Sequence, residues 1–224
     1  MVRFERKDTE KAQSAIESLQ KAKVSNSTYN TKEVNAALIE MFHGKCYICE
    51  NKKATSYQIE HLIPHKNDVE LKYDWKNLFW SCAHCNNIKL GKFDPILDCT
   101  AENIDDVIAF RKEGYFGTKE MLVFQALDER PETANTVELL KCVFYGHTPQ
   151  KIMEAKVLRK ELRDELTKFK GIIRDYMEAE GEDKKDLELY VKKELKNNSA
   201  FTAFKRWLIR DHGDYCSEFL QYIS

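Results

Sequence analysis

The chain lacks the basic surplus that is typical of a dedicated nucleic-acid-binding protein. Its 224 residues contain 36 lysines and arginines against 37 aspartates and glutamates, which gives a formal net charge of −1 at pH 7. Because the neutralisation of phosphates supplies much of the affinity of such proteins, a broad and independent nucleic-acid-binding surface is disfavoured. Either contacts with nucleic acid are confined to one face, or a partner supplies the affinity.

The chain also lacks a long apolar run. No stretch approaches the ~18 uncharged apolar residues of a membrane span. Residues 1–8 carry charges where a signal peptide needs an apolar segment. No repeat or low-complexity tract is present. We therefore expect a cytoplasmic protein without a membrane partner, in which the cysteines are kept reduced and disulfides are disfavoured.

Four of the seven cysteines form two pairs with Cys-x-x-Cys spacing, Cys46 with Cys49 and Cys82 with Cys85. The remaining three lie singly at Cys99, Cys142 and Cys216. Two such pairs can place four thiolates at the corners of one tetrahedron, the geometry of a structural Zn²⁺ ion with Zn–S distances of about 2.3 Å. The spacing therefore predicts a zinc site that joins the two ends of a segment too short to build its own core.

The segment between and after these pairs is short and irregular, and we expect the order β, β, α within it. The predicted elements are a strand over residues 55–60, a strand over 77–80 and a helix over 81–90. Two helices are expected before the segment, over residues 8–23 and 30–42, because apolar residues recur there at helical spacing behind capping residues.

Beyond residue 95 the sequence is rich in charged helix formers. We expect a strand over residues 121–127 and helices over 132–145, from Pro149 onward, over 184–196 and over 199–223, with an acidic turn at 178–186. The longest helix carries one apolar stripe, formed by Leu158, Leu162, Leu166, Phe169, Ile173 and Tyr176. This stripe is either core or a partner-binding seam, and core is the favoured alternative.

The predicted fold class is α+β, mainly α, with a small zinc-stapled ββα-metal unit embedded in a predominantly helical chain. We expect two regions, residues 1–95 with the N-terminal helices and the zinc unit, and residues 96–224 with a mainly helical, partner-binding domain.

Candidate catalytic residues lie inside the cysteine frame. Glu60 and His61 end the first predicted strand, Asn77 opens the second, and Asn86 lies early on the helix. An imidazole near its reference pKa of about 6.5 is suited to accept a proton from water. Carboxylate and amide oxygens suit a hard cation such as Mg²⁺. Taken alone, His61 is a partly buried strand histidine, but the adjacent carboxylate and the cysteine frame favour a functional role.

These residues resemble the HNH endonuclease family in its four-cysteine form. The resemblance implies that His61 is the general base, that Glu60 and Asn86 bind a catalytic Mg²⁺ or Mn²⁺, and that Asn77 holds the loop by side-chain hydrogen bonds to the backbone. Two positions depart from the family pattern: glutamate stands at residue 60, where aspartate is commoner, and asparagine at residue 86, where histidine often occurs.

A wider set of residues looks like the HNH subunits of Septu anti-phage systems, the PtuB family. The similar segments are Tyr29 with the following helix up to residues 41–50, and residues 59–64, 75–78, 81–82, 85–89 and 200–207. This resemblance implies an ABC-type ATPase partner of the PtuA kind, a role in bacterial defence, sometimes within retron operons, and a nucleic-acid substrate. DNA is preferred over RNA as the expected substrate, with transfer RNA as the RNA candidate.

Three further residues lie close to this set in the sequence. His65 and Lys89 are candidate phosphate contacts, because His65 follows His61 by four residues and Lys89 lies one helical turn past Cys85. His84 lies inside the second cysteine pair, and we expect it to be a bystander because structural zinc takes four ligands.

A second class of function stays open at this point. Zinc ribbons use the same cysteine pairs, so the chain could be a non-catalytic zinc-knuckle module that binds nucleic acid or protein. The ordered set of Glu60, His61, Asn77 and Asn86 favours the nuclease.

Overall fold

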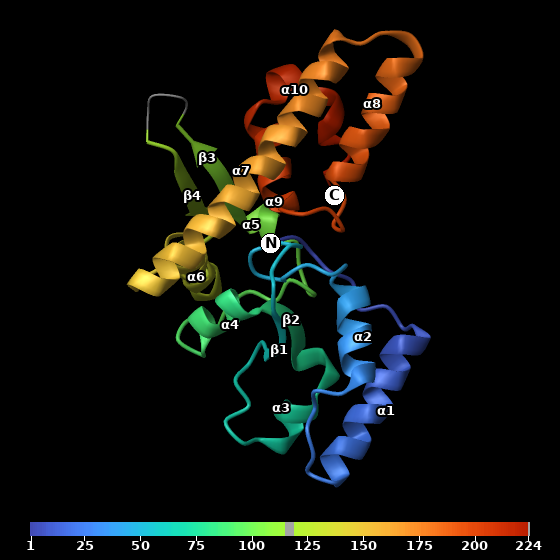
Figure 1. The fold of residues 1–224 in the computed structure, drawn as a ribbon, viewed down its shortest axis with the longest axis vertical. Coiled ribbons are helices and arrows are strands. Elements are labelled where there is room, and N and C mark those ends of the chain that lie inside the picture. The colour runs from blue at the N-terminus through green and yellow to red at the C-terminus, as the bar shows by residue number, and fades with distance from the viewer. Residues whose placement is uncertain (115–118, 224) are drawn as a thin grey trace.

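The computed structural model describes residues 1–114 and 119–223. The molecule is elongated, with helices at both ends and two small sheets between them (Figure 1). Helices α1 (Glu10–Val24) and α2 (Lys32–Met41) lie at one end, and α8 (Gly181–Glu194) and α10 (Gly213–Leu220) lie at the other. Within the described residues, none of the helices combines the length and the apolar character needed to cross a membrane.

The two N-terminal helices begin at capping threonines. The side chain of Thr9 accepts a hydrogen bond from the backbone N–H of Ala12, and that of Thr31 accepts one from Val34, so each satisfies a donor that the first helical turn leaves free. The helices pack against each other along small and aliphatic residues, which include Ala15, Leu19, Val34, Ala37 and Leu38. Both helices were predicted from the sequence and are confirmed. Their predicted ends differ from the observed ends by at most two residues.

The cysteine segment folds in the predicted order. Strand β1 (Tyr57–His61) pairs antiparallel with β2 (Leu78–Cys82), and α4 (Ala83–Lys89) follows β2 directly. The register places Tyr57 opposite Cys82 and His61 opposite Leu78. This ββα unit in a mainly helical chain confirms the predicted fold class. The connection between the strands holds two short elements that were not predicted, α3 (Val69–Tyr73) and the single 3₁₀ turn η1 (Trp75–Asn77).

A second antiparallel sheet lies beyond the ββα unit. Strand β4 (Met121–Ala126), which was expected, pairs with β3 (Ile108–Glu113), which was not, and a single turn of helix, α5 (Ile104–Val107), precedes β3. Aromatic rings fill the space between this sheet and the helices: Phe124 lies 5.3 Å from Phe144, and Phe110 lies 5.5 Å from Phe204, measured between ring centroids. Phe144 belongs to α6 (Pro131–Tyr145) and Phe204 to α9 (Thr202–Asp211).

The long helix α7 (Pro149–Glu178) runs from beside α6, in the middle of the molecule, to the end that holds α8 (Figure 1). All six residues of its predicted apolar stripe are buried, and α7 contacts α6, α8 and α9. The stripe is therefore core and is not exposed for a partner. Two other predictions for this half were wrong in their bounds. Helix α8 begins at Gly181, inside the expected acidic turn, and the helix expected over residues 199–223 is broken at His212, ahead of Gly213.

The buried apolar residues form two clusters. The larger contains residues from the N-terminus, both sheets, α6, the first half of α7 and α9. The smaller joins the end of α7 to α8 and α10 around Phe169, Val191 and Phe219. The larger cluster extends across residue 95, so the boundary predicted there does not separate two hydrophobic cores.

A buried acid anchors α5 to α9. Asp105 is 0% exposed, and its carboxylate lies 2.9 Å from the guanidinium of Arg210 and 3.4 Å from that of Arg206. Trp207 donates its indole N–H to the Asp105 carbonyl at 2.9 Å. Burial raises the pKa of Asp105, while the two arginines act in the opposite direction. The pair of arginines therefore holds an acid in the core that would otherwise be costly to ionise.

Replacing this acid tests the anchor. We expect Asp105→Ala to lower the free energy of unfolding by about 3–5 kcal/mol, because the buried guanidinium of Arg206 loses its carboxylate partner. Asp106→Ala is the control, since Asp106 makes an exposed contact with Arg210 and should cost less than about 1 kcal/mol. Urea unfolding followed by circular dichroism measures both, and equal losses in the two variants would contradict the anchoring role.

Candidate active site and metal centre

The four paired cysteines meet at the junction of the knuckle after α2, the end of β2 and the start of α4. All four are buried, and their sulfur atoms lie within 4.8 Å of one another, with Cys49 Sγ and Cys82 Sγ 3.9 Å apart. Tetrahedral zinc with Zn–S bonds of about 2.3 Å separates its sulfurs by about 3.8 Å. The donor set and its dimensions therefore fit a structural Zn²⁺, as the spacing predicted.

The four buried thiols lie close enough to affect one another's ionisation. Burial opposes ionisation of Cys46, but hydrogen bonds from Cys49, Cys82 and Cys85 outweigh it and lower the pKa of Cys46 well below its usual value. Burial raises the pKa of Cys49 and Cys85 well above theirs. A metal ion bound here would displace the thiol protons, because the thiolate is the form that binds zinc.

The first cysteine pair is fixed to the helical half through Glu50. This residue has a left-handed backbone (φ 60°) that closes the knuckle, and its N–H donates to the Cys46 carbonyl. Its buried carboxylate accepts from Lys45 Nζ at 3.1 Å, and its carbonyl accepts from the backbone N–H of Phe201, directly before α9. Movement of α9 is therefore coupled to the position of the knuckle.

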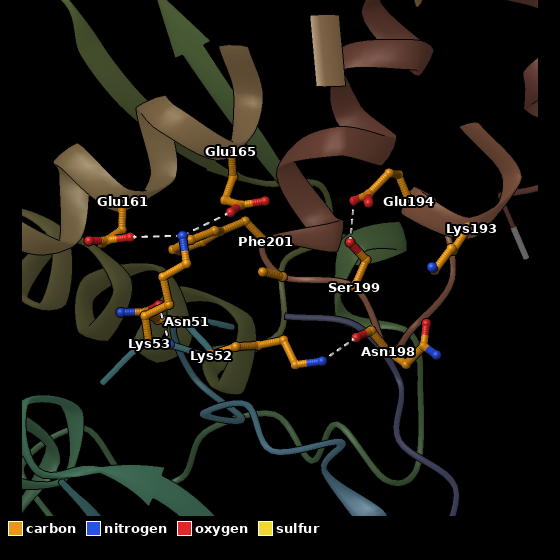
Figure 2. A pocket seen from close by; sticks show the side chains of 11 residues that line it. Asn51, Lys52, Lys53, Glu161, Glu165, Lys193, Glu194, Asn198, Ser199 and Phe201 are labelled. Carbon is orange, nitrogen blue, oxygen red and sulfur yellow. Dashed lines mark hydrogen bonds and ion pairs between the residues drawn. The ribbon is translucent and has the colours of Figure 1, made fainter. Parts of the chain in front are cut away.

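A cavity of about 290 Å³ lies beside this connection, and Figure 2 shows the side chains that line it. Lys53 reaches from the knuckle side to Glu165 at 3.2 Å and Glu161 at 3.4 Å on α7, and Lys52 donates to the Asn198 carbonyl. The positive and negative charges of the side chains along its walls balance one another. None of the predicted catalytic residues lines this cavity. It lies between the knuckle and the helical half, and it is separate from the candidate active site.

His61 lies at the end of β1 with 9% of its surface exposed. Its Nε2 atom is 3.0 Å from the Lys72 carbonyl oxygen, which can only accept, so Nε2 carries the proton and Nδ1 keeps a lone pair. Burial lowers the pKa of His61, which favours this neutral form. The rings of Tyr29 and His65 each lie 4.8 Å from its own, in edge contacts that fix its orientation.

Asn77 and Arg6 hold the connection that follows His61. Asn77 accepts from the Ile63 N–H at 2.8 Å and donates to the carbonyls of Ile63 and Leu71. Arg6 donates to the carbonyls of Trp75, Lys76 and Leu78, and its guanidinium lies over the rings of Trp75 and Phe79. No signal in the sequence indicated Arg6, because it precedes α1 and belongs to no motif.

Glu60 has a different environment from the one expected. It is 7% exposed, and its two oxygens accept from the Tyr47 hydroxyl at 2.6 Å and from Lys89 Nζ at 2.8 Å. Burial raises the pKa of Glu60, against the effects of Lys89 and Tyr47. The carboxylate is therefore committed to an internal network that joins the end of β1 to α4.

Lys89 is the centre of that network and requires a correction. It is 0% exposed, and besides Glu60 it contacts the carbonyls of His61 and Leu62 and the carboxylate of Asp94. A phosphate contact, which the sequence suggested, is not open to a lysine whose ammonium group is enclosed by four oxygen partners. Its position one turn past Cys85 directs it inward onto β1.

Asn86 lies on the exposed side of the ββα unit. Its amide donates to Gln58 Oε1 at 2.7 Å, and both residues line a depression of about 420 Å³ together with Tyr29 and Tyr57. Among the residues that the structure describes, the four cysteines are the one group of three or more His, Cys, Asp or Glu donors close enough to hold an ion. Glu60 and Asn86 thus fit a hard cation only in part. Asn86 is accessible, but both carboxylate oxygens of Glu60 already accept hydrogen bonds within the protein.

His84 is not among the cysteine donors, and it contacts the helical half of the chain. Its Nδ1 lies 2.6 Å from Glu154 on α7 and its Nε2 lies 2.8 Å from the Val143 carbonyl on α6. These two contacts tie α4 to α6 and α7.

Comparisons with known proteins agree with this geometry. Residues 46–91 match the family model for HNH endonucleases. The chain is 31% identical over 83 residues to the Septu protein PtuB of Bacillus thuringiensis, an alignment that covers 34% of this chain and 32% of the relative. The match thus spans about a third of the relative's length. No solved structure matches the chain. The resemblance to the HNH family and to PtuB is confirmed.

The metal centre is tested by metal content. We expect about one Zn²⁺ per purified chain, and we expect Cys82→Ser to lose it and to unfold the ββα unit, because structural zinc contributes on the order of 10 kcal/mol or more to such units. Cys142→Ser, which removes a single cysteine of α6 outside the cluster, should keep both metal and stability. Folded protein without zinc, or a Cys82→Ser variant as stable as the parent, would show the assignment to be wrong.

Proposed function

We propose that this chain is a nuclease that hydrolyses phosphodiester bonds of nucleic acid, with His61 as the general base. The observation that carries the proposal is the fixed imidazole of His61 at the end of β1, within a segment that matches the HNH endonuclease model. Its Nε2–H is held by the Lys72 carbonyl, which leaves Nδ1 free to accept a proton from water.

The reaction needs a water to be deprotonated as it attacks phosphorus, and a leaving oxygen to depart on the opposite side. Nδ1 of His61 accepts the water proton, and the Lys72 carbonyl stabilises the imidazolium that results. Asn77 and Arg6 keep the 62–78 connection in place, and Lys89 fixes the His61 and Leu62 carbonyls. These contacts keep the base in one orientation, which is the condition for efficient proton transfer.

Glu60 and Asn86 are the proposed ligands of a catalytic Mg²⁺ or Mn²⁺. Such a cation would offset the negative charge that develops on the phosphate and the leaving oxygen. Asn86 offers an accessible amide oxygen, and each Glu60 oxygen keeps a second lone pair beyond its hydrogen bond to Lys89 or Tyr47. Mg²⁺ retains several waters and takes only one or two protein ligands, so this pair suffices in number.

The proposed setting is a Septu-like defence complex with an ABC-type ATPase partner of the PtuA kind, as part of a retron operon in some cases. The likeness to PtuB supports this setting, and so does the balanced charge, because an enzyme without a basic surplus relies on a partner to hold nucleic acid. DNA is the preferred substrate and transfer RNA the alternative. A non-catalytic zinc-knuckle module is the competing function, and a cleavage assay separates the two.

The general-base role is tested with the zinc-loaded chain and its neighbour-encoded ATPase. We expect His61→Ala to abolish cutting of plasmid DNA or transfer RNA while zinc content and partner binding stay unchanged. His147→Ala, at an exposed histidine between α6 and α7, is the control and should cut normally. Near-normal hydrolysis by His61→Ala would exclude this site as the nuclease centre.

The metal ligands are tested separately. Glu60→Gln and Asn86→Ala should lower the cutting rate by about 100-fold or more, and raised Mn²⁺ should restore part of it, because a metal that binds more tightly compensates for a weakened ligand. Glutamine is used at residue 60 because alanine would remove one of the two carboxylates that contact the buried ammonium of Lys89.

Partner docking by the helical half is tested on exposed apolar residues, since the α7 stripe is core. The double variants Met153→Glu with Val157→Glu on α7, and Leu189→Glu with Tyr190→Glu on α8, change surface positions of the two helices. We expect at least one of them to weaken pull-down of the ATPase tenfold or more, about 1.4 kcal/mol. The control is Leu90→Glu on the ββα unit, and full binding by both double variants would contradict docking through these faces.

A further inference from the structure

A second histidine lies against the proposed base. The ring of His65 is 4.8 Å from that of His61, at an interplanar angle of 60°. His61 is at the end of β1 and His65 is in the connection that follows, so the turn through residues 62–64 brings the two rings together. His65 is half-buried and retains a solvent-facing part.

The hydrogen bonds of His65 define which of its nitrogens carries a proton. The backbone N–H of Asn67 donates to His65 Nδ1 at 3.1 Å. A nitrogen that accepts a hydrogen bond holds a lone pair, so the proton of the neutral ring is on Nε2. His65 is therefore a donor through Nε2, whereas His61 is an acceptor through Nδ1.

The backbone around His65 is shaped to hold this arrangement. Lys66 and Asn67 both have positive φ, 44° and 69°, and consecutive left-handed residues other than glycine are uncommon. This turn aims the Asn67 N–H at the His65 ring, and the N–H of Asp68 donates to the His65 carbonyl at 2.6 Å. Strained backbone of this kind is retained where the surrounding structure requires it, commonly at functional sites.

An acceptor and a donor on neighbouring rings match two neighbouring atoms of the reaction. A water about to attack phosphorus lies about 3–3.5 Å from it, and the nonbridging oxygens are bonded to that same phosphorus. One nitrogen can take the water proton while the other donates to a nonbridging oxygen, where negative charge grows in the transition state.

We propose that His65 is a further catalytic residue, which binds a nonbridging oxygen of the scissile phosphate through Nε2–H beside the general base His61. This inference rests on the proposed nuclease function and deepens it, since it names a phosphate contact on the protein side of the reaction. The contact changes no bond of its own, because the Nε2 proton stays on His65 throughout the attack.

The substitution series at residue 65 distinguishes a donor from a spacer. Glutamine places an amide N–H near the position of Nε2, whereas asparagine places one near Nδ1. We expect His65→Ala and His65→Asn to lower kcat by about 100-fold, the usual effect of removing one oxyanion donor, and His65→Gln to retain activity within about fivefold. His147→Ala is the control, because it removes an exposed histidine between α6 and α7 and leaves the His65 donor in place.

The assay uses the full zinc-loaded chain with its ATPase, and plasmid DNA or transfer RNA, whichever the parent cuts. Equal activity of His65→Ala and the parent, with His61→Ala inactive, overturns the role of His65 and leaves the nuclease proposal standing. Equal loss in the glutamine, asparagine and alanine variants also overturns it, because a merely structural histidine would behave in that way. Normal cutting by His61→Ala overturns the nuclease proposal itself.

A spectroscopic measurement tests the geometry without relying on activity. In the ¹⁵N-histidine-labelled, zinc-loaded chain, nitrogen chemical shifts report which ring nitrogen is protonated. We expect His65 to be protonated on Nε2, with Nδ1 shifted as an acceptor. A His65 ring protonated on Nδ1 in the parent chain overturns the inference.

Discussion

The rest of the candidate site depends on the meeting of four cysteine sulfurs within 4.8 Å. The sheet between the two pairs consists of two strands of five residues, and a two-stranded sheet of this size is marginally stable in water without further support. The cluster closes one end of that sheet, where Cys82 at the end of β2 lies opposite Tyr57 at the start of β1. Cys46 and Cys49 belong to the knuckle before β1, and Cys85 lies in the first turn of α4. Because the helix starts directly at the cluster, its direction across β1 is set there.

Once α4 lies across β1, polar side chains define the shape of the connection between β1 and β2. Lys89, Asn77 and Arg6 donate to backbone carbonyls between His61 and Leu78. Buried carbonyls need donors, so removing any of these side chains would leave an acceptor of this connection unsatisfied. The backbone on either side of His61 is therefore held by donors from three separate parts of the chain.

The sequence foretold local features better than tertiary ones. Capping threonines, the cysteine spacing and the apolar stripe of α7 are local signals, and they led to α1, α2, the ββα order and the buried face of α7. Strand β3 was missed because Arg111, Lys112 and Glu113 are helix formers, and the strand exists through its pairing with β4. The bounds of α8 and the break before α10 were also missed, since neither is determined by spacing alone.

In the candidate site, too, local features were predicted better than tertiary ones. The cysteine cluster follows from spacing, and the His61 position follows from the motif, but neither indicates which way Lys89 points. Its burial depends on Glu60, Asp94 and two carbonyls, which come together only when α4 packs on β1. Arg6 is a similar case, because its three acceptors lie about 70 residues away along the chain.

The contacts between the two regions of the chain attach the helical half to the ββα unit. His84, inside the second cysteine pair, contacts Glu154 of α7 and the Val143 carbonyl of α6, and Glu50, directly after the first pair, accepts from the backbone before α9. Each knuckle of the cluster is thus attached to a different part of the C-terminal half. A protein that bound to α7 would therefore contact a helix that is attached to the second cysteine pair through His84.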